Sequence, residues 1–225
     1  MPLVLVATPI GNLGDLSPRA AEALRNADYW IVEDTRVSGK LQSHLGIKKP
    51  MKVLNEHTAE SKVQALVDEL GEEASAAMLT DAGCPGISDP GAHFVDLCSE
   101  AGIEVDAVPG PSAVTTALML SGFFAQRFAF LGYLPRKPGD QKAILREFFD
   151  SPMTLVLFES PFRTGKLIET LAEVLGSRRY AICREMTKVH QQVYRYRLPE
   201  GPPEENPSLK GEVTVVVEGM RRTLR

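Results

Sequence analysis

The sequence lacks the long apolar runs, the cysteine framework and the leader segment that mark several common classes of protein. No apolar run reaches the ~18 residues that span a bilayer, and the nearest candidate, residues 113–125, contains two threonines, a serine and a glycine. The first residues are apolar, with no basic segment before them, unlike a signal peptide. Three widely spaced cysteines argue against disulfides and against a cysteine-rich zinc site. We therefore expect a cytoplasmic protein without a membrane partner.

Several catalytic and nucleotide-binding signatures are also missing. The sequence contains neither a G-x-x-x-x-G-K-[ST] phosphate loop nor a G-x-G-x-x-G dinucleotide fingerprint. It has no G-x-S-x-G nucleophile turn and no H-E-x-x-H zinc motif. The four histidines are scattered along the chain, and a lone histidine is more often structural than a ligand. We expect no metal centre.

A basic surplus is absent as well, since the formal net charge is −4. Phosphate-binding proteins usually show such a surplus. Here the positive charge is local. The basic residues gather late in the chain, at Arg178, Arg179, Arg184, Lys188, Arg195 and Arg197, and at the end, at Arg221, Arg222 and Arg225. Such groups are often solvated faces, so two interpretations stay open, a solvated face and a nucleic-acid contact.

The first half of the sequence alternates strand-like and helix-like segments. Apolar runs at residues 3–7, 29–32, 51–54, 76–79 and 105–108 indicate strands. Helical spacing or capping residues mark 17–26, 59–70, a segment ending at 101, and 113–120. Because strands that alternate with helices usually form a parallel sheet covered on both faces, we expect an N-terminal α/β domain over residues 1–112.

The order of predicted strands and helices is different in the second half of the sequence. Strands are expected at 127–134, 154–158, 180–184, 193–197 and 213–218, and helices at 140–149 and 164–175. Several strands follow one another without an intervening helix. This pattern predicts a C-terminal mixed α+β domain over residues 113–225.

Three turns rich in glycine and proline directly follow predicted strands, at residues 8–14, 81–91 and 109–113. In an open α/β sheet, ligands bind beyond the carboxyl ends of the strands, where such loops converge. Glycine permits close approach of the backbone and proline holds a turn rigid. Each turn alone is compatible with a simple tight turn, but the three together indicate a ligand site of unnamed chemistry.

A series of motifs then carries a resemblance to a known family. In order, they are residues 6–15 (VATPIGNLGD), 33–36 (EDTR), 56–57 (EH), 81–91 (DAGCPGISDPG), 108–113 (VPGPSA), 158–161 (FESP), 184–188 (REMTK) and 210–212 (KGE). The series resembles the branch of the tetrapyrrole methylase superfamily that methylates small-subunit ribosomal RNA. The resemblance runs from residue 3 to about residue 219.

The resemblance implies two α/β domains with a cleft between them that holds the methyl donor S-adenosylmethionine. It also implies a homodimer and transfer to the 2′-oxygen of a cytidine in 16S rRNA, as free rRNA or within the 30S subunit. Carried over by motif, the donor contacts fall on Ile10, Leu79, Asp81, Cys84, Ser112, Ala113, Phe158, Glu159 and Met186.

The acceptor needs a base, because a ribose hydroxyl is a poor nucleophile until its proton is removed. Among the carboxylates of the matched motifs we favour Glu33 and Glu185. Lys188 can serve only with a strongly depressed pKa. Arg36, Arg163 and Arg184 suit phosphate binding, because a planar guanidinium pairs with phosphate in a bidentate manner. A structural salt bridge is the alternative for each of these charged residues.

This sequence departs from the family pattern at three motif positions. Phe162 stands where we expect histidine, Thr58 where asparagine is usual, and Cys84 where threonine is typical. Many relatives also continue beyond the last motif into a small helical domain thought to grip RNA. Two other functions therefore stay open, methylation of a small tetrapyrrole-like acceptor and a non-catalytic role in ribosome assembly.

Overall fold

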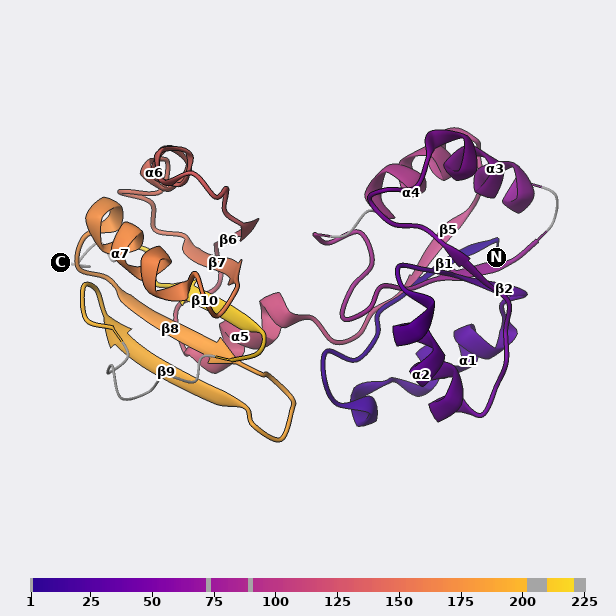
Figure 1. Cartoon of the computed structure of the whole chain (residues 1–225), viewed down its shortest axis with the longest axis horizontal. Coiled ribbons are helices and arrows are strands. Elements are labelled where there is room, and N and C mark those ends of the chain that lie inside the picture. Colours follow the sequence, from indigo (N-terminus) through magenta and orange to yellow (C-terminus); the bar gives the residue numbers. More distant parts are fainter. Residues whose placement is uncertain (1, 72–73, 89–90, 202–209, 221–225) are drawn as a thin grey trace. The chain divides into compact units, whose positions relative to one another are not determined.

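A computed structural model describes residues 2–71, 74–88, 91–201 and 210–220 (Figure 1). The chain divides into two compact units, Met1–Ser112 (unit 1) and Ala113–Arg225 (unit 2). Two parts of the sequence-based interpretation, residues 89–90 of the second turn and the basic Arg221, Arg222 and Arg225, lie outside the described residues. Within those ranges, no helix has the length and apolarity needed to cross a membrane.

Unit 1 is an α/β layer structure around a parallel sheet. Its strands are β1 (Leu3–Val6), β2 (Tyr29–Val32), β3 (Met51–Val53), β4 (Ala76–Met78) and β5 (Val105–Val108). Its helices are η1 (Leu13–Asp15), α1 (Pro18–Asn26), α2 (Thr35–Leu45), α3 (Glu60–Gly71) and α4 (Gly91–Glu100). The strand order is β3-β2-β4-β1-β5, and every pair is parallel. The expected parallel N-terminal sheet is confirmed.

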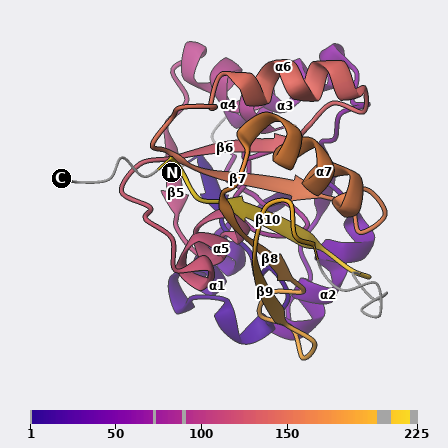
Figure 2. The same ribbon diagram turned by 90° about the vertical axis from the view of Figure 1, so that its left-hand side faces the viewer.

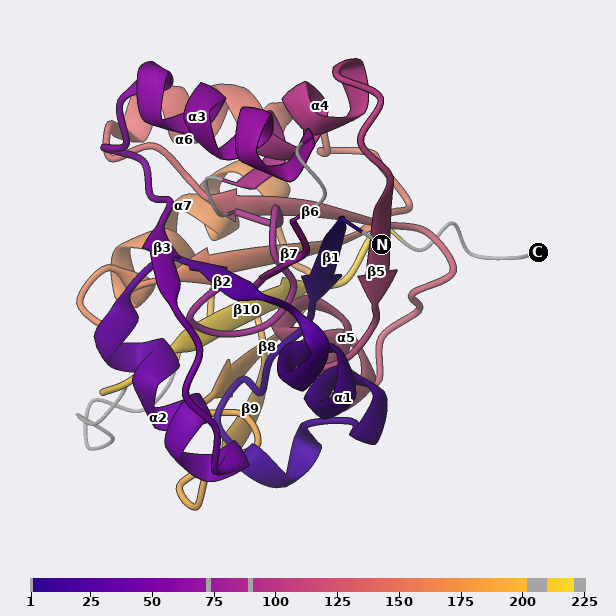
Figure 3. The ribbon, with the colours of Figure 1, turned by 90° about the vertical axis from the view of Figure 1, so that its right-hand side faces the viewer.

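Alternate residues of the strands enter two separate hydrophobic cores, as the two-residue period of a strand requires. Tyr29 and Ile31 of β2 pack with α3 and α4, while Trp30 and Val32 pack with α1 and α2. Figure 3 shows the two helix pairs on opposite faces of the sheet. The Trp30 side chain is fully buried, and its indole N–H donates to the Leu24 carbonyl at 2.9 Å.

Helix α2 was not among the helices expected from the sequence. It begins at the N-cap Asp34, whose carboxylate accepts from the Arg36 N–H, and it ends at Gly46 in the left-handed conformation. Its buried residues are Ser38, Leu41 and Gln42. Because two of these are polar, the apolar period that reveals a helix in sequence is weak here.

Unit 2 is a mixed sheet with helices on both faces. Its strands are β6 (Phe128–Tyr133), β7 (Thr154–Glu159), β8 (Arg179–Arg184), β9 (Gln192–Arg197) and β10 (Val213–Val217). Its helices are α5 (Ala113–Ser121), α6 (Pro138–Arg146) and α7 (Thr164–Leu175). The order is β6-β7-β10-β8-β9, with β6 and β7 parallel and the other pairs antiparallel (Figure 2). The expected mixed second half is confirmed.

The two ends of this sheet carry different groups. Because β7 and β8 are both antiparallel to β10, they run in the same direction and finish at one end, the carboxyl end, where β10 begins. At the opposite, amino end, β8 begins while β9 and β10 finish. Helices α6 and α7 cover one face of the sheet, and α5 packs against β8 and β10.

Candidate functional site

The three glycine- and proline-rich turns of unit 1 follow three adjacent strands. Strands β4, β1 and β5 are neighbours and parallel, so their turns leave the same end of the sheet. Thr8 and Gly83 join the first two turns through a pair of backbone hydrogen bonds of 2.9 and 3.1 Å. The Cys84 thiol of the second turn donates to the carbonyl of Pro111 in the third at 3.5 Å. The turns therefore converge.

Two glycines permit this close approach. Gly83 has a φ of 90°, a conformation that side-chain-bearing residues rarely adopt. Gly110 lies over the first turn, where a Cβ would come within 3.1 Å of the Ala7 Cβ and 3.4 Å of the Ala7 carbonyl oxygen. A larger residue would strain the backbone at position 83, and at position 110 it would require Ala7 to shift.

A cavity of about 600 Å³ opens beside these turns, at the carboxyl ends of β2, β3 and β4. Its lining is mostly acidic and consists of Glu33, Asp34, Asn55, Glu56, His57, Asp81 and Ser88. The Thr80 hydroxyl donates to the Glu33 carboxylate at 3.2 Å and so fixes its orientation. A lining of this charge suits a cationic ligand.

Arg36 lies beside this cavity, and its side chain is 89% exposed. It forms an ion pair of 2.5 Å with Asp34. The side-chain and backbone hydrogen bonds from Arg36 lower the pKa of Asp34 to about 2. The guanidinium therefore balances one carboxylate of the cavity while its outer face stays in solvent.

At the carboxyl end of the unit 2 sheet, Glu159 closes β7 with a side chain that is only 1% exposed. One of its oxygens accepts from the Ser160 N–H at 2.7 Å, and the other lies 3.3 Å from Arg163. Arg163 also donates to the carbonyls of Leu134 and Pro135. Glu159 and Arg163 thus hold the ends of β6 and β7 together.

Beside them, the turn after β8 has a backbone in an unusual conformation. Glu185 and Thr187 have φ values of 48° and 66°, although neither is glycine. The Glu185 carboxylate accepts from the Lys188 ammonium at 3.0 Å and from the Glu212 N–H at 2.8 Å. A side chain at Gly211, whose φ is 99°, would collide with that carboxylate. The last two motifs, residues 184–188 and 210–212, are therefore in direct contact.

Electrostatics fix the charge states of this pair. Burial disfavours the Glu185 carboxylate, but hydrogen bonds from the Glu212 N–H and Lys188 outweigh it and lower the pKa of Glu185. Burial likewise disfavours the Lys188 ammonium, yet Glu185 and Glu212 raise its pKa above the ordinary value. Near neutral pH, Glu185 is an anion and Lys188 a cation.

The other expected residues of unit 2 lie near the same end. Phe158 belongs to an aromatic group, with ring centroids 4.9 Å from Phe130 and 5.7 Å from Tyr133. Met186 is buried, and Ala113 begins α5. Arg184 donates to the carbonyls of Lys210 and His190 and to the Gln192 side chain.

In unit 1, the structure brings most of the expected donor residues together. The Ile10 side chain packs beside Gly83, Asp81 lines the acidic cavity, and Cys84 reaches the turn that ends at Ser112. Leu79 is different, because its side chain is buried in a hydrophobic core. Its backbone alone can face a ligand.

Sequence reasoning did not select several residues of these sites. Asn55 and Ser88 line the cavity, and Glu212 contacts both Glu185 and Lys188. Glu212 and Ser88 both lie within motifs of the series, which is the signal that could have selected them. Asn55 lies just before a motif and had no such signal. Across the described parts of the chain, no group of three or more His, Cys, Asp or Glu residues is arranged to hold a metal ion.

Comparison with known proteins gives consistent results. A family model for tetrapyrrole (corrin/porphyrin) methylases matches residues 2–201. Ribosomal RNA small subunit methyltransferase I of Thermotoga maritima is 40% identical over 218 residues, 96% of this chain and 98% of its own length. The same-named proteins of Haemophilus influenzae and Mycobacterium tuberculosis are 42% and 44% identical over 96% of this chain, and 78% and 77% of their own lengths are covered.

Solved structures show the same fold at low sequence identity. The methyltransferase CobJ aligns with a TM-score of 0.71 at 16% identity, over 98% of this chain and 95% of that one. Uroporphyrin-III-C-methyltransferase from Thermus thermophilus aligns with a TM-score of 0.66 at 21% identity, over 96% and 93%.

Proposed function

The chain belongs to the tetrapyrrole (corrin/porphyrin) methylase family, which uses S-adenosylmethionine as methyl donor, and from that premise we propose that it methylates the ribose 2′-hydroxyl of a cytidine in small-subunit rRNA. The observation that carries the proposal is the match to T. maritima ribosomal RNA small subunit methyltransferase I over 98% of that protein. Because the match covers nearly all of that relative, it has no room for a further helical domain beyond the matched region.

The converging turns of unit 1 fit the donor. S-adenosylmethionine is a sulfonium cation with an α-amino group, and when bound it supplies an electrophilic methyl group. The Asp81 carboxylate can accept hydrogen bonds from the donor and balance part of its charge. Gly83 and Gly110 let the backbone of the turns approach a flat ligand closely. The family resemblance also implies donor contacts at Phe158 and Met186 of unit 2, and we include both in the proposal.

We assign proton removal from the ribose hydroxyl to Glu33. Its carboxylate lines the cavity that Asp81 also lines and accepts a hydrogen bond from the Thr80 hydroxyl. Glu185 is a weaker candidate, because Lys188 and the Glu212 N–H stabilise its charged form and so reduce its basicity. Lys188 carries its proton near neutral pH, so we assign it an electrostatic role near the phosphate or the donor.

The RNA backbone is proposed to contact Arg36, Arg163 and Arg184. Arg36 has the most exposed guanidinium of the three and can add a phosphate to its contact with Asp34. Arg163 and Arg184 already bind carbonyls of their own unit, which fixes their position. Positioning of both substrates should supply much of the rate of an in-line transfer.

A methyl-transfer assay tests the proposal. Purified protein is incubated with labelled S-adenosylmethionine and undermethylated small subunits, and the rRNA is then digested to nucleosides. We expect label in 2′-O-methylcytidine. Label in a tetrapyrrole but in no RNA would establish the small-molecule acceptor instead. Failure to bind millimolar donor in calorimetry would leave the non-catalytic assembly role.

A homodimer in the cytoplasm forms part of the same proposal, and the family resemblance supports it. Sedimentation equilibrium on the full chain measures the assembly state directly. A monomer at micromolar concentration would contradict that part of the proposal without affecting the methyl-transfer assay.

A further inference from the structure

Two aromatic side chains are exposed at the carboxyl end of the unit 2 sheet. Phe162, in the turn between β7 and α7, is 95% exposed, and Tyr133, the last residue of β6, is 63% exposed. Because β6 and β7 are parallel neighbours, both residues follow or end a strand at the same end of the sheet. An aromatic ring left in water forgoes the stabilisation that burial provides. Neither ring has a role in the function proposed above.

The turn that carries Phe162 is fixed by hydrogen bonds. The Ser160 carbonyl accepts from the Arg163 N–H at 3.1 Å, which closes the turn. The Arg163 side chain donates to the carbonyl of Leu134 at 3.0 Å, directly after Tyr133. The turn is therefore joined to the loop after β6, and the Phe162 ring is presented on a fixed backbone.

Tyr133 is supported by other aromatic rings. Its ring centroid lies 5.7 Å from that of Phe158, which in turn lies 4.9 Å from that of Phe130. Both pairs meet edge to face, an arrangement that aromatic rings favour. The two inner rings thus hold Tyr133 in place while most of its own surface stays in solvent.

The loops around these rings carry more basic than acidic side chains. The described loops at this end, residues 134–137, 160–163, 185–191 and 210–212, contain five Lys or Arg residues and two Glu residues. This local surplus of positive charge contrasts with the net charge of −4 for the whole chain. Arg136 and Lys137 are exposed, and neither side chain has an ion pair or a hydrogen bond within the described residues. Unpaired cations beside exposed rings favour a polyanion with flat groups.

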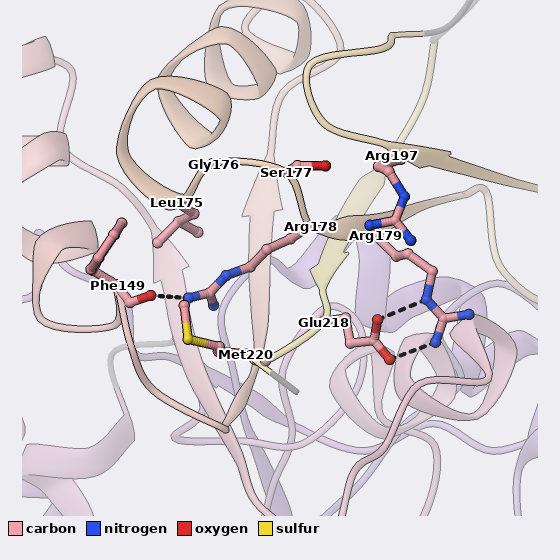
Figure 4. Close-up of a pocket in the computed structure, with 10 residues that line it drawn as sticks. Phe149, Leu175, Gly176, Ser177, Arg178, Arg179, Arg197, Glu218 and Met220 are labelled. Atoms are coloured by element: carbon pink, nitrogen blue, oxygen red, sulfur yellow. Dashed lines mark hydrogen bonds and ion pairs between the residues drawn. The ribbon is translucent and has the colours of Figure 1, made fainter. Parts of the chain in front are cut away.

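The amino end of the same sheet is different, although a cavity of about 600 Å³ there is also lined by three arginines (Figure 4). Arg179 is paired with Glu218 through two hydrogen bonds of 2.7 and 2.5 Å. Arg178 is buried, and it donates to the carbonyl of Phe149. Two of the three arginines are thus held by the protein itself. The exposed side chain of Phe149 at this end provides a matched control for Phe162.

We propose that the rings of Phe162 and Tyr133, with the two cations after β6, bind an unpaired nucleotide of the RNA substrate. The inference rests on the proposed function. Bases of single-stranded RNA stack on aromatic side chains, while nearby cations bind the phosphates. Phe158, one of the proposed donor contacts, touches Tyr133, so this nucleotide lies near the target cytidine. The surface therefore selects RNA in which a neighbour of the target is unpaired.

Fluorescence anisotropy with a labelled single-stranded oligoribonucleotide tests the stacking on the full chain, without methyl donor. We expect Phe162→Ala to bind this RNA about 5- to 100-fold more weakly than the original chain, the usual effect of losing one stacked base. Phe162→Trp should bind at least as tightly as the original chain. Phe162→Leu keeps an apolar side chain without a ring and should bind as weakly as Phe162→Ala. Phe149→Ala removes an exposed ring from the other end of the sheet and should bind as the original chain does.

A salt series and a paired RNA test the remaining parts of the inference. In Arg136→Ala, RNA affinity should fall and the slope of log K against log salt should shrink by about 1. Arg127→Ala, just before β6 at the amino end, removes the same charge and should change neither quantity. A fully paired RNA should bind equally to Phe162→Ala and the original chain, because its stacked bases offer no free face.

Three results would overturn the inference: no binding of single-stranded RNA by the original chain, unchanged affinity in Phe162→Ala, or full affinity in Phe162→Leu. A shift of the assembly state in Phe162→Ala, measured by sedimentation, would also overturn it by identifying a second copy of the chain as the occupant. The proposed function fails separately, in the methyl-transfer assay. Methylation of rRNA by Phe162→Ala with an unchanged KM for small subunits would leave that function standing and remove only the stacking role.

Discussion

The carboxyl ends of the two sheets use different means to place functional groups. In unit 1, backbone hydrogen bonds between Thr8 and Gly83 fix the turns, and carboxylates such as Asp81 face a cavity. In unit 2, carboxylates are paired with cations of the same end, as Glu159 is with Arg163 and Glu185 with Lys188. The unit 1 end thus offers negative charge to a ligand, while the unit 2 end uses its charges to hold strands and a strained turn.

The largest effect should come from Glu33→Gln, which keeps the shape and the Thr80 contact but removes the base. We expect the turnover rate to fall by about 10²- to 10⁴-fold, the usual contribution of a general base, with little change in donor affinity. Single-turnover kinetics with labelled donor measure this step.

Glu185→Gln is the matched variant in unit 2. Because Lys188 and Glu212 already stabilise the Glu185 anion, we expect a smaller loss of rate than for Glu33→Gln. A larger loss of rate in Glu185→Gln than in Glu33→Gln would identify Glu185 of unit 2 as the base, and would contradict the difference proposed between the two sheet ends.

The second largest effect should be on donor affinity. Asp81→Ala removes a carboxylate of the unit 1 cavity, so S-adenosylmethionine should bind about 10- to 100-fold more weakly. Calorimetry measures the affinity. Glu104→Ala removes the same charge from the opposite end of that sheet, just before β5, and serves as the control. Equal donor affinity in Asp81→Ala and the original chain refutes this placement.

A smaller effect is expected for Arg184→Ala in unit 2. If its guanidinium contacts a phosphate, RNA affinity should fall about equally for all sequences, and the slope of log K against log salt should shrink by about 1. Donor affinity should not change. Filter binding of rRNA across a salt series makes the measurement. Loss of thermal stability with an unchanged salt slope would identify Arg184 as a residue that only supports the turn after β8.

The smallest expected effect concerns stability at high pH, where the two units should behave alike. Burial raises the pKa of Cys98 in unit 1 and of Cys183 in unit 2 to about 11, from the ordinary thiol value of 9.0. The unfolded thiols lose their protons first, so the stability they support is present below pH 9 and is lost progressively between pH 9 and 11. Urea unfolding across this range, followed for each thiol by alkylation, measures the loss. A fall confined to one thiol would show that the units differ.

Much of the fold was predictable because its strands are apolar runs between turns. In unit 1, β2 and β4 are buried throughout, and β1, β4 and β5 lead into turns with glycine or proline, so the number of strands and their parallel direction could be predicted. Helix α2 could not, since Ser38 and Gln42 occupy buried positions that an apolar pattern would assign to hydrophobic residues. The pairing of β10 between β7 and β8 also depends on contacts between distant segments, which no local pattern encodes.

Residues of the candidate site could be selected from the sequence where a motif contained them and not elsewhere. The motifs located Asp81 and Glu185, but their spacing does not reveal that the N–H of Glu212, just before β10, donates to Glu185. The late arginines appeared in sequence as one basic group with two open interpretations. In the structure they separate, because Arg178 is buried at one end of the sheet while Arg184 ends β8 at the other.

The contact between the first two turns has a consequence for biogenesis. The Thr8 hydroxyl donates to the carbonyl of Thr80, which lies 72 residues further along the chain. Contacts between residues so far apart in sequence form late in folding, because closing a large loop costs conformational entropy. During synthesis from the N-terminus, a nascent chain cannot bring the three turns together until β4 and β5 have emerged. If these turns bind the donor as proposed, donor binding by nascent chains of increasing length would report when the N-terminal sheet is complete.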